Sequence, residues 1–141
     1  MDNEPIAVER NGLLFICSGN GSRSQMAVAF ARYIGPAEIS YFSAGASVVR
    51  EPNAHAIRVM KEVGVDLLSS SSLAMDEIPL HTIATVISLC EPEECPPLPD
   101  GVHHLSWPLP DPFQPGCSEH ELLMEIRQVR NQIRELVSRL F

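Results

Sequence analysis

The stretch FICSGNGSRSQMAVAF, residues 15–30, joins three kinds of local sequence. An apolar run that begins at Leu13 is typical of a buried strand and stops abruptly at Cys17. A short loop with two glycines follows, and from Ser24 onward the sequence is typical of a helix. The stretch therefore predicts a strand–loop–helix unit with a cysteine at the end of the strand and Arg23 at the start of the helix.

Downstream of this unit, segments typical of strands alternate with segments typical of helices. Strands are expected at 12–17, 38–44, 84–89 and 102–107, and helices at 24–34, 53–63, 119–140 and, briefly, near 74–80. Asn53 and Ser118 have the side chains of N-caps, and Gly64 is a suitable helix-ending residue. This alternation predicts a mostly parallel sheet that is covered on both faces.

The overall composition limits the classes of function. The length of 141 residues suits one domain spanning 1–141, with residues 1–11 as a loose N-terminal extension. The net charge of −8 argues against a nucleic-acid partner, which would need a basic face. The early apolar run from Leu13 to Ile16 is too short for a signal peptide or a membrane span. We therefore expect a cytoplasmic protein with no membrane partner.

Three chemically active side chains follow three of the predicted strands. Cys17 ends the first strand, Cys90 follows the third, and Asp111 lies in the loop after the fourth. In parallel sheets, ligands bind at the carboxyl ends of the strands. We expect these three residues to share one edge of the sheet.

The loop after the first strand suits an oxyanion, because a glycine-rich turn into a helix directs successive N–H groups toward one point. Arg23 adds a planar fork for two oxygens of a tetrahedral anion. The same field should lower the pKa of Cys17, leaving it largely thiolate at neutral pH, with Ser24 donating to the sulfur. This arrangement predicts covalent attack on phosphate, arsenate or a phosphoester. The expected oxyanion-binding residues are Ser18, Gly19, Asn20, Gly21, Ser22, Arg23 and Ser24.

Several motifs together resemble the low-molecular-weight tyrosine phosphatase superfamily. They are CSGNGSRSQMA from Cys17, FSAG at 42–45, HAIRVMKEVGVD at 55–66, VISLC at 86–90 and SWPLPDP at 106–112. More narrowly, NGSRSQMA resembles the arsenate reductases built on that fold. The resemblance implies an α/β three-layer sandwich with a four-stranded parallel sheet flanked by helices. It also implies Cys17 as nucleophile, Arg23 as oxyanion clamp and Asp111 as general acid.

The likeness to arsenate reductases further implies a thiol cascade that reduces arsenate to arsenite. Cys17 would form an adduct with arsenate, Cys90 would attack its sulfur, and Cys95 would resolve the resulting disulfide. The spacing Cys-x4-Cys is tighter than the Cys-x6-Cys of the thioredoxin-coupled form. Thioredoxin and glutathione with glutaredoxin therefore both stay open as reductants. We expect a monomer without a cofactor, in which phosphate or sulfate can substitute for arsenate as bound oxyanion.

Two other functions stay open. A low-molecular-weight phosphatase would use the same loop and Asp111 to hydrolyse phosphomonoesters. A non-catalytic zinc or redox sensor would use Cys90, Cys95, His103 and His104. Adjacent histidines on a strand point to opposite faces, so these four side chains do not easily reach one ion. We therefore predict no metal site.

Two features near the predicted loop carry no prediction of a site. Some reductase relatives hold potassium beside the loop, and Asn20 and Ser43 match such a site, but Leu73 replaces an acidic residue. Cys117 lies beyond the Asp111 loop without an evident partner, and we expect it to be incidental.

Overall fold

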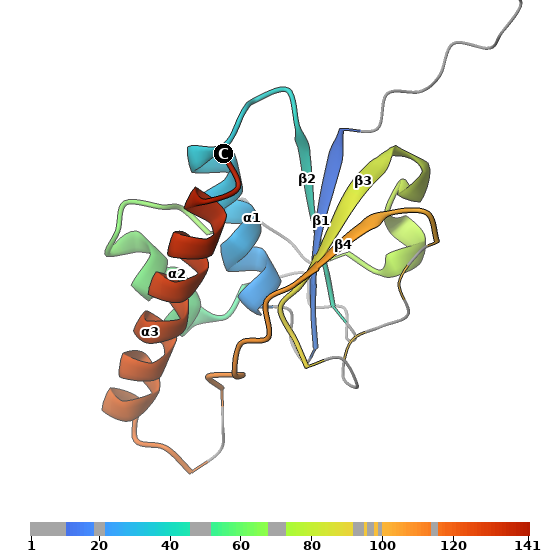
Figure 1. The fold of residues 1–141 in the computed structure, drawn as a ribbon. Coiled ribbons are helices and arrows are strands. Elements are labelled where there is room, and N and C mark those ends of the chain that lie inside the picture. The colour runs from blue at the N-terminus through green and yellow to red at the C-terminus, as the bar shows by residue number, and fades with distance from the viewer. Residues whose placement is uncertain are drawn as a thin grey trace, which may run out of the picture.

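The computed structural model describes residues 11–18, 22–45, 52–67, 73–91, 95, 98, 100–113 and 116–141. The described residues form four strands and three α-helices in the order β-α-β-α-β-β-α, with two short 3₁₀ helices before the third strand (Figure 1). The elements are β1 (Gly12–Cys17), α1 (Ser22–Ile34), β2 (Ser40–Gly45), α2 (Ala54–Lys61), η1 (Met75–Glu77), η2 (Leu80–Thr82), β3 (Ile83–Ser88), β4 (His103–Ser106) and α3 (Glu119–Ser138). Of the expected N-terminal extension, only Asn11 lies within the described residues.

The strands form one sheet in the order β2-β1-β3-β4, and every neighbouring pair is parallel. Leu14 of β1 pairs with Phe42 on one side and with Val86 on the other. The apolar run of β1 therefore occupies an interior strand, where both faces are buried. The four-stranded parallel sheet that the sequence analysis expects is confirmed.

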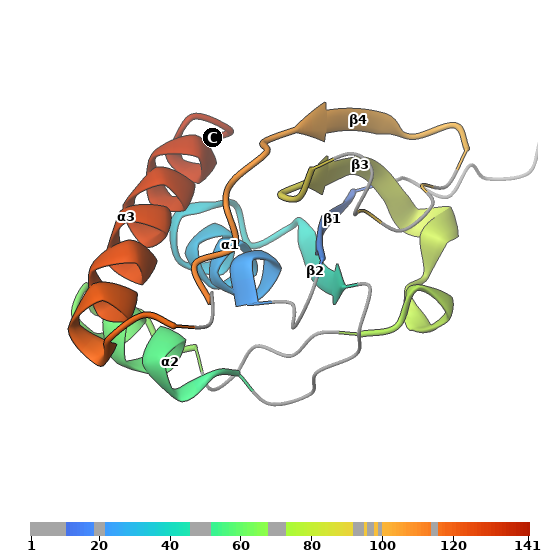
Figure 2. The same ribbon diagram turned by 90° about the horizontal axis from the view of Figure 1, so that it is seen from below.

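The two faces of the sheet are covered differently. All three α-helices pack on one face, where Phe15 of β1 meets Phe30 and Ile126 in the larger apolar cluster (Figure 2). On the other face, Ile16 packs with Ile78 in a smaller cluster that η1, η2 and the segment after β3 cover. The predicted three-layer arrangement is thus confirmed, with 3₁₀ helices in the third layer.

The ends of the helices follow the predicted capping residues. Asn53 Oδ1 accepts from the amide of His55 at 2.8 Å, and Ser118 Oγ accepts from the amide of Glu121 at 3.2 Å. After α2, Gly64 takes the left-handed conformation with φ of 78°, which turns the chain away from the helix. The predicted helix near 74–80 is instead two 3₁₀ turns, η1 and η2. Pro79 lies between them and offers no backbone N–H to continue the first.

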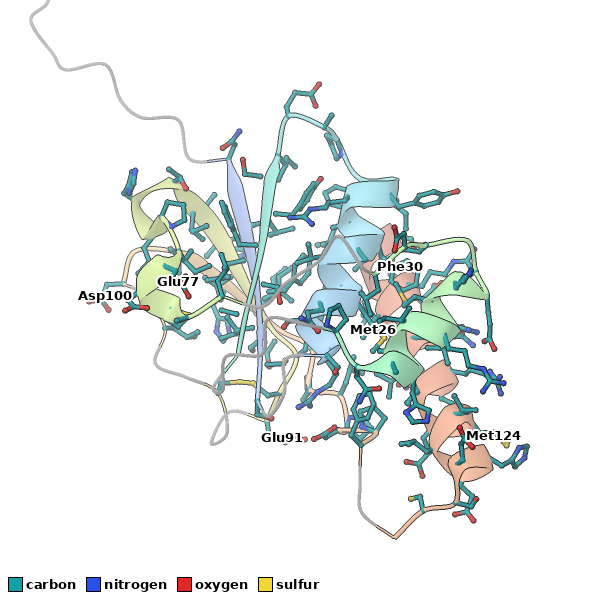
Figure 3. All side chains as sticks on the ribbon, turned by 180° about the vertical axis from the view of Figure 1, so that it is seen from behind. Met26, Phe30, Glu77, Glu91, Asp100 and Met124 are labelled. Carbon is teal, nitrogen blue, oxygen red and sulfur yellow. A yellow bond between two sulfur atoms is a disulfide. The ribbon has the colours of Figure 1, made fainter. Side chains whose placement is uncertain are left out.

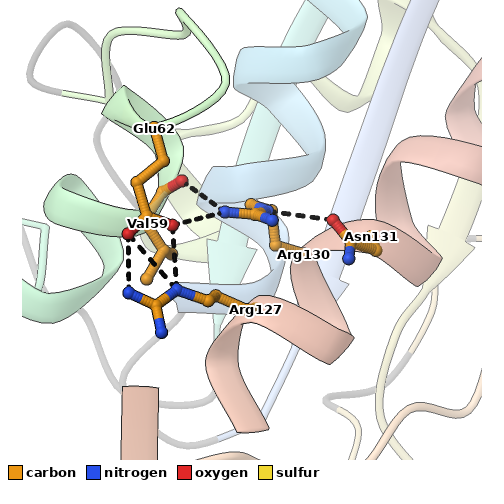
Figure 4. A network of polar contacts seen from close by, with 5 residues as sticks. All are labelled: Val59, Glu62, Arg127, Arg130 and Asn131. Atoms are coloured by element: carbon orange, nitrogen blue, oxygen red, sulfur yellow. Dashed lines mark hydrogen bonds and ion pairs between the residues drawn. The ribbon is translucent and has the colours of Figure 1, made fainter. Parts of the chain in front are cut away.

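An ionic network joins α2 to α3 on the helix-covered face (Figure 4). The Glu62 carboxylate accepts from Arg127 Nη2 at 2.7 Å and from Arg130 Nη1 at 2.8 Å. Arg130 Nη1 also donates to the carbonyl of Val59 at 2.9 Å. The hydrogen bond from Arg127, reinforced by Arg130, lowers the pKa of Glu62 to about 2.

Among the described residues, no helix is long and apolar enough to cross a membrane.

Candidate active site

The carboxyl edge of the sheet gathers the residues that follow β1, β3 and β4. The hydrogen-bond ladder continues one step past β3, because the Leu89 amide donates to Ile16 O at 2.8 Å. The Leu109 amide in turn donates to Leu89 O at 3.3 Å. This edge therefore brings the chain around Cys17, Cys90 and Leu109 together, although these residues are far apart in sequence.

Cys17 lies at the end of β1, fully buried in the apolar cluster under the helices. Its thiol donates to Ser24 Oγ at 3.2 Å, and Ser24 Oγ lies 2.8 Å from Ser43 Oγ. Burial raises the pKa of Cys17, and the Ser24 hydroxyl and amide, with the charge and amide of Arg23, only partly oppose this. The expectation of a largely ionised thiol at neutral pH is therefore wrong for this structure, since desolvation outweighs the hydrogen bonds.

Arg23 is buried at the start of α1 and spans three separate segments. Its Nη1 donates to Leu109 O at 2.8 Å and to Leu89 O at 3.2 Å. Its Nη2 donates to Ser18 Oγ at 2.8 Å. The guanidinium thus ties the loop after β1 to the chain that leaves β3 and β4. Side-chain patterns do not predict this role, because three of the four acceptors, including Ser18 O at 3.4 Å, are backbone carbonyls.

Cys90 and Cys95 form a disulfide, with a Cα–Cα distance of 5.8 Å. Figure 3 shows it as a yellow bond near the sheet edge, in the region of Glu91. Cys90 is fully buried, whereas Cys95 is half-buried against the smaller apolar cluster. The two cysteines that the resemblance implies as second and third members of a cascade are therefore bonded to each other.

Cys17 and this disulfide lie on opposite faces of the sheet. Side chains alternate along an extended strand, and Leu89 points to the helix-covered face that also holds Cys17. Cys90 is the next residue and is bonded to Cys95, which packs on the other face. In this disulfide form, the edge of the sheet separates the nucleophile from its candidate redox partners.

Asp111 lies in the loop after β4, two residues beyond the carbonyl that binds Arg23. Its Oδ1 accepts from the amide of Phe113 at 3.0 Å, which fixes the carboxylate in a tight turn. The side chain is half-buried. This placement leaves a carboxyl group at the same edge as Cys17, as a general acid would require.

Other expected site residues are placed as follows. Ser18, Ser22 and Ser24 flank the loop, whereas Gly19, Asn20 and Gly21 lie outside the described residues. Within the described part of the chain, no group of three or more His, Cys, Asp or Glu side chains is arranged to hold a metal ion.

The histidines of β4 do not join the cysteines around a common point. His104 Nε2 lies 3.0 Å from Ser88 Oγ, a pairing that the sequence analysis did not predict. The register of β4 could have suggested it, because His104 is opposite Val86 and Ser88 is two residues further along the same face.

Comparison with known proteins agrees with this geometry. The family model described as low molecular weight phosphotyrosine protein phosphatase matches residues 12–141, and the chain belongs to that family. It is 31% identical to an arsenate reductase of Bacillus licheniformis, over 94% of this chain and 96% of that protein. It is 33% identical to an arsenate reductase of Bacillus subtilis, over 89% of this chain and 91% of the relative.

Solved structures show the same likeness in three dimensions. An arsenate reductase in its oxidized state superposes with a TM-score of 0.76 at 33% identity, covering 92% of this chain and 95% of the other. The likeness therefore extends over nearly all of both chains.

Proposed function

We propose that this protein is an arsenate reductase, which converts arsenate to arsenite by a cysteine nucleophile and a thiol/disulfide cascade. The observation that carries the proposal is the Cys90–Cys95 disulfide at the sheet edge that also holds Cys17 and Arg23. A phosphatase needs a nucleophile and an acid, but it does not need two further thiols. The curated relatives that match nearly the whole chain carry the same name.

In the first step, Cys17 Sγ attacks the arsenic of arsenate and one oxygen leaves as water. The leaving oxygen needs a proton, and a neutral Cys17 thiol carries one. The raised pKa of Cys17 is thus compatible with the chemistry, provided that the thiol proton ends on the departing oxygen. Asp111 is the carboxyl group placed to pass this proton, and Arg23 binds the oxygens that remain.

In the second step, the Cys90 thiolate attacks Cys17 Sγ. A Cys17–Cys90 disulfide forms, the sulfur–arsenic bond breaks, and its electron pair stays on arsenic, which leaves as arsenite. Because the disulfide form has Cys90 on the face opposite Cys17, residues 89–91 must turn around the sheet edge for this attack. Leu89 is the pivot, since its carbonyl meets Arg23 while its amide binds Ile16.

In the third step, the Cys95 thiolate attacks Cys90 Sγ and releases Cys17 as a thiol. The Cys90–Cys95 disulfide of the structure is the product of this step. An external dithiol then reduces it, and we propose thioredoxin or glutathione with glutaredoxin in this role. Such donors are kept reduced in the cytoplasm, which we propose as the site of action. The named residues all come from one chain, so a monomer suffices.

The test is arsenite production by pre-reduced protein with the thioredoxin system and the glutaredoxin system supplied separately. We expect catalytic arsenite with at least one system and none in the Cys17→Ser variant. Cys117→Ser is the matched control, because Cys117 is the other free cysteine and has no part in the cascade. Absence of arsenite with both systems, together with turnover of an aryl phosphate, would instead establish a phosphatase.

A further inference from the structure

A hydrogen-bonded serine–histidine pair on β3 and β4 has no part in the steps above. Ser88 Oγ at the end of β3 is 3.0 Å from His104 Nε2 on β4. Ser88 is 3% exposed, whereas His104 is exposed to solvent. A buried hydroxyl therefore holds the imidazole at one point, while the rest of the side chain is exposed to solvent.

The backbone places this pair close to Cys90. Main-chain hydrogen bonds to Ile16 and from Trp107 continue the ladder one residue beyond β3, to Leu89. Ser88 shares the face of Val86, and Cys90 is bonded to Cys95, which packs on that face. Residues two apart on an extended strand are about 7 Å from each other. Cys95 also packs on this face. His104 thus lies on the same side of the sheet as the disulfide. Its hydrogen-bond partner Ser88 is two residues before Cys90.

We propose that His104, held by Ser88, is a positioning residue for reduction of the Cys90–Cys95 disulfide. Its imidazolium charge stabilises the thiolate that leaves when the disulfide is opened. This inference rests on the proposed function, because it concerns the last step of the same cascade.

The burial of the two sulfurs determines which one leaves. Cys95 is half-buried and Cys90 is fully buried, so an external thiolate attacks Cys95 Sγ. The Cys90–Cys95 bond breaks, and Cys90 leaves with the electron pair as a thiolate. A second thiolate of the donor then attacks the mixed disulfide, which frees Cys95 and leaves the donor oxidised. Because a better-stabilised leaving thiolate departs faster, protonated His104 accelerates the first of these two steps.

Other titratable groups lie on the elements that cover this face. The hydrogen bond that the structure gives for His104, within the described residues, is the one to Ser88. His103 precedes it on β4 and points to the opposite face. The described titratable groups on the elements covering this face are Asp76, Glu77, His81, Glu91, Cys95 and Asp100. The carboxylates among them repel a leaving thiolate. A nearby positive charge therefore stabilises that thiolate.

The experiment measures the rate at which dithiothreitol reduces the Cys90–Cys95 disulfide of the full chain. Each variant is compared with the wild-type protein at the same pH, so that the thiolate fraction of dithiothreitol is the same in both measurements. At pH 6, His104→Gln should be about three-fold slower, because glutamine cannot carry the positive charge of an imidazolium. At pH 8.5 the two proteins should be equal. His103→Gln is the matched control and should equal wild type at both values.

A charge that does not titrate completes the test. His104→Lys should match wild type at pH 6 and exceed it at pH 8.5. A His104→Gln rate equal to wild type at pH 6, or reduced by the same factor at both values, would overturn the inference. Mapping the disulfide after one turnover with arsenate separates the two proposals. If no Cys90–Cys95 disulfide forms, the proposed function is wrong. If the disulfide forms and wild type and His104→Gln are reduced at the same relative rate at both pH values, only the role of His104 is wrong.

Discussion

The two faces of the sheet divide the candidate chemistry between them. The helix-covered face holds Cys17, buried under α1 and hydrogen-bonded to Ser24. The opposite face holds the Cys90–Cys95 disulfide, covered by 3₁₀ turns and connecting segments. In the proposed cascade, one face therefore contains the cysteine that receives the oxyanion, and the other contains the two cysteines that exchange disulfide partners.

This division has a physical basis in how each face is stabilised. On the helix-covered face, α1 packs against α3, and the ionic network around Glu62 joins α2 to α3. On the other face, each 3₁₀ helix spans three residues, and such turns form fewer and poorer hydrogen bonds than an α-helix. Local opening costs less where packing and hydrogen bonding are sparse. The face with the disulfide is therefore the one that opens more easily, as the proposed attack of Cys90 on Cys17 requires.

Arg23 joins the segments that follow β1, β3 and β4, so its replacement should have the largest effect. Arg23→Lys keeps a positive charge but cannot donate to Leu89 O, Leu109 O and Ser18 Oγ together. We expect arsenite production to fall at least about 100-fold, as for loss of an oxyanion donor. The free energy of unfolding should fall by about 1–3 kcal/mol, because a buried carbonyl loses its donor.

The control for Arg23 is on the same helix. Arg32→Lys changes an exposed arginine that donates to Tyr41 O at 3.3 Å, away from the residues that follow β1, β3 and β4. It should leave arsenite production unchanged. Near-normal turnover in Arg23→Lys would contradict the role of its guanidinium.

The core of the helix-covered face should tolerate truncation less well than the opposite core. Ile133→Ala on α3 removes a fully buried side chain, and we expect it to cost about 4 kcal/mol. Ile78→Ala follows η1, where the short turn can collapse into the space, and should cost about 2 kcal/mol. Urea denaturation of both variants measures the difference. Equal costs, or a larger cost at Ile78, would mean that the two faces are equally well packed.

The thiols of the reduced protein should differ in reactivity according to their face. At pH 7, iodoacetamide should label Cys17 at least about ten-fold more slowly than Cys95, because the thiolate is the nucleophile. Burial raises the pKa of Cys17, so its labelling should accelerate only as the pH rises beyond 9.0, the ordinary value of a cysteine. Denatured protein, which should label uniformly, is the control. Labelling of Cys17 first at pH 7 would restore the expectation of an ionised thiol.

The smallest effect concerns the network that joins α2 to α3. The pKa of Glu62 is about 2, below its ordinary value of 4.5. The ionised form stabilises the fold above pH 4.5, and this contribution is lost as the pH falls toward 2. Because Glu62 is about one-third exposed, we expect acidification to cost about 1 kcal/mol more in wild type than in Glu62→Gln. An equal loss of stability in both proteins would show that the ionised Glu62 does not stabilise the fold.

Much of the fold could be predicted because its signals are local. The apolar run before Cys17 predicts β1, and the polar side chains of Asn53 and Ser118 mark helix starts through bonds within a few residues. The gathering of Cys17, Cys90 and Asp111 at one edge follows from parallel topology alone.

The features that could not be predicted from the sequence depend on contacts between residues far apart in the chain. Arg23 meets carbonyls that are 66 and 86 residues away in sequence, and backbone oxygens leave no trace in the side-chain pattern. The pKa of Cys17 was predicted from its loop and helix, whereas burial by the helix layer decides its direction. The face on which Cys90 lies depends on how far the β3 ladder extends, which the apolar run does not fix.

The most direct test of the transfer between faces is a single turnover without external thiol. Pre-reduced Cys95→Ser and Cys90→Ser are each mixed with arsenate, assayed for arsenite and mapped by mass spectrometry. If Cys90 crosses the edge to attack Cys17, Cys95→Ser should release about one arsenite per protein and stop as a Cys17–Cys90 disulfide, by the stoichiometry of exchange. Cys90→Ser should release almost none. Equal arsenite from both variants, with no Cys17–Cys90 bond, would contradict the cascade.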